Sequence, residues 1–84
     1  MKFEADWCAS CIAYKPIFKK AVEEWGVPFK IVNVDKDKET AHKYKVTTIP
    51  TTVWLDSQGN EVHRLVGKRE LPELVDVIKE FKDV

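Results

Sequence analysis

The alternation of short apolar runs with amphipathic stretches constrains the fold of this 84-residue chain most strongly. Strands are predicted at residues 1–5, 29–34, 51–55 and 61–67, and helices at residues 11–25, 39–44 and 70–81. The run at 29–34 is β-branched and mostly apolar, which is typical of a buried strand. The expected order is therefore β-α-β-α-β-β-α.

A strand, a crossover helix and a second strand form a right-handed parallel pair. The turn sequence DSQGN at residues 56–60 predicts an antiparallel hairpin between the last two strands. We expect an α/β fold with a mixed four-stranded sheet and about three flanking helices. A chain of this length is expected to be one domain, residues 1–84.

Composition narrows the function classes. Lys and Arg total 14, and Asp and Glu total 14, so the formal net charge is zero and nothing favours nucleic acid or an anionic membrane as partner. No apolar run is long enough to span a membrane, and no secretory signal is visible near Met1. Two cysteines are too few for a disulfide-stapled secreted scaffold, so we expect a cytoplasmic protein.

Cys8 and Cys11 are the only cysteines. A zinc site needs two more ligands, and His42 and His63 are too far apart in sequence to form the usual arm, so we expect no metal. A four-residue ring would stabilise little as a staple. A redox pair at a helix start is favoured, because helix N–H groups stabilise a Cys8 thiolate while Cys11, one turn in, acts as the resolving thiol.

Four features follow one another along the chain: ADWCASC at residues 5–11, Pro16, YKVTTIPT at residues 44–51, and Gly67. In this order they resemble the thioredoxin family. Residues 5–11, ADWCASC, are similar to its A-x-W-C-x-x-C active site, and Pro16 matches its helix-kinking proline. Residues 44–51, YKVTTIPT, are similar to its Y-x-V-x-x-I-P-T segment, and Gly67 stands where the family has a glycine after the last strand. The resemblance extends from residue 3 to residue 81.

The resemblance implies a thiol–disulfide oxidoreductase that reduces protein disulfides through a Cys8/Cys11 cycle without a bound cofactor. Pro50 is expected to be cis beside the cysteines, with the Ile49 backbone pairing with substrate. Trp7, Ile49, Pro50 and Gly67 are the expected docking residues. Electrons would come from an NADPH-linked flavoprotein resembling thioredoxin reductase, or from glutathione.

The sequence departs from the family pattern in three ways. The usual first strand and helix are lacking, so the strand at 29–34 should be an uncovered sheet edge; we expect a monomer, with a dimer through that edge as the alternative. The dipeptide between the cysteines is Ala9-Ser10 rather than Gly-Pro. Ser10 can donate a hydrogen bond to the Cys8 sulfur or face water, and we favour water.

The third departure concerns proton transfer. Lys2 and Ile31 stand where the family has a buried Asp and Lys. Glu4 shares a strand face with Lys2 and is our candidate base for Cys11, while Lys2 could instead stabilise the Cys11 thiolate directly. The alternative is that Lys2 and Glu4 both reach solvent.

Two other functions stay open. A glutaredoxin-like, glutathione-dependent reductase fits the length, although this chain has C-A-S-C and T-I-P instead of C-P-Y-C and T-V-P. A binding subunit of thioredoxin fold, with incidental redox activity, would use the surface around Trp7 and Ile49.

Overall fold

The fold is a four-stranded mixed sheet flanked by three helices. It was obtained as a computed structural model, and the structure describes residues 1–81. The elements are β1 (Lys2–Glu4), α1 (Ala9–Trp25), β2 (Ile31–Asn33), α2 (Lys38–Lys43), β3 (Thr51–Leu55), β4 (Glu61–Val66) and α3 (Leu71–Phe81). The strand order is β2-β1-β3-β4. Strand β1 pairs in parallel with β2 and antiparallel with β3, and β3 pairs antiparallel with β4.

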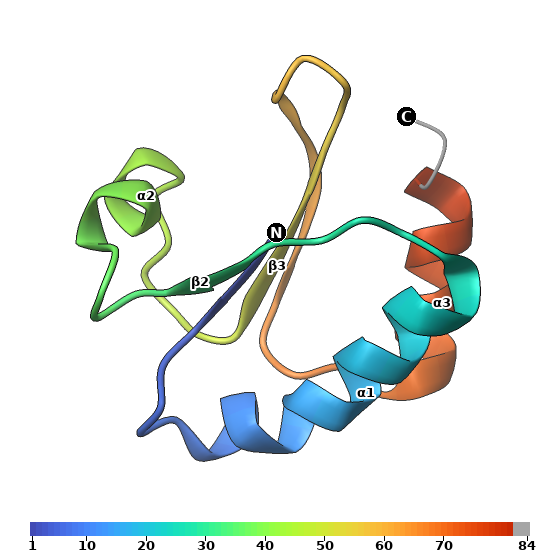
Figure 1. Cartoon of the computed structure of the whole chain (residues 1–84), viewed down its shortest axis with the longest axis horizontal. Helices are drawn as coiled ribbons and strands as arrows, with labels where there is room; N and C mark the ends of the chain where they lie inside the picture. Colours follow the sequence, from blue (N-terminus) through green and yellow to red (C-terminus); the bar gives the residue numbers. More distant parts are fainter. Residues whose placement is uncertain (82–84) are drawn as a thin grey trace.

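The helices cover the two faces of the sheet. Helices α1 and α3 lie on one side and α2 lies on the other, as Figure 1 shows. Within residues 1–81, no helix is long and apolar enough to cross a membrane.

Each face of the sheet has its own apolar cluster. The cluster under α1 and α3 contains Tyr14, Phe18, Ala21, Val22, Leu74 and Ile78. The cluster under α2 contains Phe3, Val32, Ala41 and Val53. Because strand residues alternate between faces, placing Phe3 toward α2 turns Lys2 and Glu4 toward α1.

The predicted order of elements and the mixed four-stranded sheet are confirmed. Most of the observed bounds of the helices and strands differ from the predicted ones by one or two residues. The run at 29–34 forms only the three-residue strand β2, and the expectation that it is buried is wrong for its outer side. Val32 is buried, but Phe29 and Ile31 are 47% and 43% exposed, because β2 is at the sheet edge in the described chain.

Candidate active site

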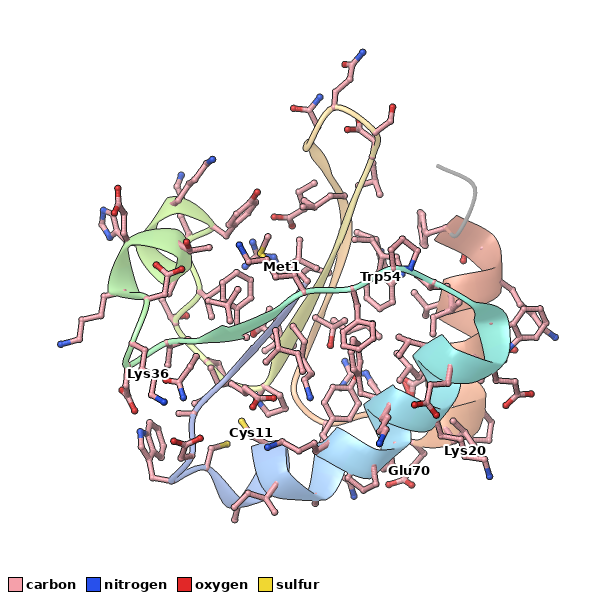
Figure 2. The ribbon with its side chains drawn as sticks, viewed as in Figure 1. Met1, Cys11, Lys20, Lys36, Trp54 and Glu70 are labelled. Atoms are coloured by element: carbon pink, nitrogen blue, oxygen red, sulfur yellow. The ribbon has the colours of Figure 1, made fainter. Side chains whose placement is uncertain are left out.

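The two cysteines lie at the N-terminal end of α1. Cys8 is the N-cap of this helix, and its sulfur accepts a hydrogen bond from the Cys11 backbone N–H at 3.2 Å. This is the contact that a serine or aspartate side chain makes at an ordinary N-cap. Figure 2 shows the Cys11 side chain pointing from the helix toward the sheet. Both thiols are free, and both residues are buried.

Ser10 is also in contact with the Cys8 sulfur. Its Oγ lies 3.3 Å from Cys8 Sγ, so the expectation that Ser10 simply faces water is wrong. The hydroxyl is a donor that an ionised sulfur can use, and it adds to the Cys11 N–H.

The two thiols ionise differently. Burial disfavours ionisation of Cys8, but hydrogen bonds from Cys11 and Ser10 outweigh it and hold the pKa of the Cys8 thiol below its usual value. Burial, a hydrogen bond to Cys8 and the negative charges of Cys8 and Glu4 raise the pKa of Cys11 to about 11. Cys8 is therefore equipped as the nucleophile, and Cys11 stays protonated until a base removes its proton.

The loop before β3 closes one side of the cysteine pair. Ile49 packs against the cluster of Ala5, Cys8 and Cys11, and its carbonyl oxygen lies 3.9 Å from Cys8 Sγ. The Ile49–Pro50 peptide bond is cis. The Gly67 backbone N–H donates to the Pro50 carbonyl at 2.7 Å, which links the end of β4 to this loop. The structure thus brings the segments of Cys8, Ile49 and Gly67 together.

Large apolar side chains are exposed around this pair. Trp7 is 70% exposed, and its indole Nε1 donates to Asp35 Oδ2 at 2.7 Å, which fixes the ring. Ile12 and Val66, next in sequence to Cys11 and Gly67, are 58% and 47% exposed. The sequence analysis missed Ile12 and Val66. For Ile12 a signal was present, because it is apolar yet lies off the buried stripe of α1.

Lys2 and Glu4 are both buried, so the alternative that they reach solvent is wrong. Lys2 Nζ lies 2.9 Å from Glu4 Oε1, and Lys15 Nζ lies 3.7 Å from Glu4 Oε2. Lys15 is a third residue that the sequence analysis missed. Within the described residues, no three His, Cys, Asp or Glu side chains are grouped in a way that could hold a metal ion.

Comparisons with known proteins identify relatives along nearly the whole chain. Residues 1–80 match the family described as Thioredoxin. The chain is 38% identical to the thioredoxin of Mycoplasma pneumoniae over 79 residues, covering 93% of this chain and 76% of the relative. It is 40% identical to the Bacillus subtilis thioredoxin over 79 residues, covering 88% and 75%. It is also similar to the solved structure of Fasciola hepatica thioredoxin, at 35% identity and a TM-score of 0.88, covering 96% and 77%.

Proposed function

Because this chain belongs to the thioredoxin family and is a thiol–disulfide oxidoreductase, we propose that it reduces disulfide bonds in other proteins. Cys8 attacks the target disulfide and forms a mixed disulfide. Cys11 then attacks the Cys8 sulfur, which leaves the target reduced and the two cysteines joined. The observation that carries the proposal is the position of Cys8 at the N-cap of α1, where its sulfur accepts the Cys11 N–H at 3.2 Å, and the pKa of Cys8 is accordingly lowered while that of Cys11 is raised.

The target docks on the exposed apolar side chains around the cysteines. Trp7, Ile12 and Val66 provide the apolar contact area, and Ile49, Pro50 and Gly67 provide backbone next to Cys8. An extended target segment pairs with the Ile49 backbone as an added strand does.

Glu4 serves as the base for Cys11. Glu4 is buried, with 7% of its surface exposed. Its negative charge is one of the causes that raise the pKa of the Cys11 thiol. The position of Glu4 supports this role, because the next residue, Ala5, packs against Cys11; the proton would pass directly or through one water molecule. If Glu4→Gln leaves the pH dependence of disulfide reduction unchanged, this assignment is wrong.

The protein needs no bound cofactor in this scheme. Its electrons come from an NADPH-linked flavoprotein reductase, with glutathione as the competing source. A reduction potential of about −270 mV would fit a reductant, and one of about −120 mV would fit an oxidant. We propose that the chain works as a monomer; sedimentation would reveal a dimer paired through β2, where Phe29 and Ile31 are exposed.

Insulin reduction by dithiothreitol tests the function. The wild-type protein should accelerate precipitation of the insulin chains, and Cys8→Ser should abolish the acceleration. Cys11→Ser should instead accumulate a mixed disulfide with the target. A protein that acts only as a binding subunit would keep its partner in Cys8→Ser and would not accelerate the reaction.

A further inference from the structure

The ammonium group of Lys2 is buried in the interior. Lys2 is 1% exposed and lies on β1, which has a strand on each side. Its Nζ lies 2.9 Å from Glu4 Oε1, 4.7 Å from the centroid of the Phe18 ring and 5.7 Å from that of the Tyr14 ring. Removing a charge from water is costly, and buried ion pairs can often be replaced by apolar side chains without loss of stability. Packing alone therefore does not require a lysine here.

Glu4 connects this buried ammonium to the surface. One carboxylate oxygen contacts Lys2, and the other lies 3.7 Å from Lys15, whose side chain is 57% exposed. A hollow of about 290 Å³ opens beside the three side chains. The charged and titratable groups that α1 places around the Lys2–Glu4 pair and its hollow are Cys11, Tyr14, Lys15, Lys19 and Glu23. In the sheet, Lys2 is paired with Ile31 on β2 and Thr52 on β3, and Glu4 is paired with Asn33 on β2.

We propose that Lys2 is a positioning residue for the second half-reaction: its ammonium group holds the Glu4 carboxylate in place, so that Glu4 can accept the proton of Cys11. This inference rests on the proposed function. A buried carboxylate that loses its cation is left with an uncompensated cost of burial, so in the absence of Lys2 the Glu4 side chain would not be held in this position. Lys2 therefore acts on the reaction through Glu4.

Glu4 accepts the Cys11 proton, and the Cys11 thiolate attacks the sulfur of Cys8 in the mixed disulfide. The Cys8–Cys11 bond forms as the bond from Cys8 to the target breaks, and the target sulfur leaves with the electron pair. The target has then gained two electrons and the cysteine pair has lost two. Glu4 returns its proton to solvent on the side of Lys15.

Ellman's reagent separates the two half-reactions. Attack by Cys8 releases one thionitrobenzoate, and attack by Cys11 on the resulting mixed disulfide releases the second. In Lys2→Met the second release at pH 7 should slow at least tenfold and recover toward high pH, while the first stays within twofold of the wild type. Lys19→Met, which removes a lysine from the same hollow, should leave both phases within twofold. An unchanged second phase in folded Lys2→Met overturns the proposal.

A double variant distinguishes an action through Glu4 from a direct action on Cys11. Lys2→Met/Glu4→Gln leaves no unpaired buried charge from this pair, so it is informative even where Lys2→Met fails to fold. Its second phase should equal that of Glu4→Gln alone within twofold. A second phase that is slower in the double variant than in Glu4→Gln would mean that Lys2 stabilises the Cys11 thiolate directly. A second phase in Glu4→Gln that is as fast as in the wild type would mean that Glu4 is not the base. Either result overturns the proposal.

The proposed function can be contradicted by a result that leaves the inference about Lys2 testable. A wild-type protein that shows both thionitrobenzoate phases but does not reduce insulin would contradict protein-disulfide reduction. The dependence of the second phase on Lys2 and Glu4 could still be measured in that protein.

Discussion

At the scale of single residues, Cys8 combines a structural and a chemical role. Its sulfur occupies the position of the oxygen in an ordinary N-cap, so the Cys11 N–H that satisfies the helix end also stabilises a thiolate. The first turn of α1 contains no acidic residue, so no carboxylate there competes for the positive end of the helix dipole. The reactive anion is thus part of the helix start itself.

Removing the Ser10 hydroxyl should make Cys8 less reactive. The Ser10 contact is among the hydrogen bonds that lower the pKa of the Cys8 thiol, so Ser10→Ala should raise that pKa. A hydrogen bond of about 1 kcal/mol corresponds to a roughly fivefold loss of thiolate near neutral pH. The measurement is the rate of alkylation by iodoacetamide against pH. Ser57→Ala, in the exposed turn after β3, is the control, and identical pH profiles for the two variants would contradict the assignment.

Residue-level prediction worked where the chemistry is local in sequence. Cys8, Cys11 and Ile49-Pro50 can be recognised from short motifs. The alternation of side chains along a strand also predicted that Lys2 and Glu4 share a face, and the 2.9 Å separation of Lys2 Nζ and Glu4 Oε1 confirms it. It could not predict that this face is buried, because burial depends on α1 packing across it.

At the scale of elements, local chemistry decides where each one ends. Helix α1 begins two residues earlier than predicted, because cysteine is not among the usual capping residues. Strand β2 ends at Asn33, whose Oδ1 accepts hydrogen bonds from the backbone N–H groups of Asp35 and Lys36 and so turns the chain. Side-chain contacts of this kind compete with strand pairing and are hard to read from apolar patterns.

Substitutions at two glycines, Gly67 and Gly59, can distinguish an effect on stability from an effect on activity. Gly67 and Gly59 have φ values of 93° and 83°, in the region that disfavours a Cβ. Gly67→Ala and Gly59→Ala should therefore each lower the free energy of unfolding by roughly 1 kcal/mol, measured by urea denaturation. Only Gly67 is bonded to Pro50 beside the cysteines, so only Gly67→Ala should also slow insulin reduction. Equal activity in the two variants would remove Gly67 from the docking surface.

At the scale of the whole molecule, the site exists only in the folded chain. The cysteines enter from the turn between β1 and α1, Ile49 and Pro50 from the loop before β3, and Gly67 from the end of β4. These three segments are far apart in sequence, and the sheet order places their ends together. The ionisation of the thiols is consequently linked to folding, and the link can be measured.

The stability of the reduced protein, relative to a Cys8→Ser/Cys11→Ser variant, should pass through a maximum near pH 9. The pKa of Cys8 is lower in the folded than in the unfolded chain. At pH values between its folded pKa and about 9, the unfolded chain therefore binds the extra proton, and stability rises with pH. The pKa of Cys11 is raised from 9.0 to about 11, so between these values the folded chain holds the extra proton and stability falls.

The fall between pH 9 and 11 should amount to up to roughly 2 kcal/mol, since one pKa unit corresponds to about 1.4 kcal/mol. Urea denaturation of both proteins at each pH gives the difference, in which the remaining titrating groups cancel. The oxidised wild-type protein has no titrating thiol and should show no maximum. A difference that stays level between pH 9 and 11 would mean that Cys11 ionises as an ordinary thiol in the folded protein, which would contradict the raised pKa of Cys11.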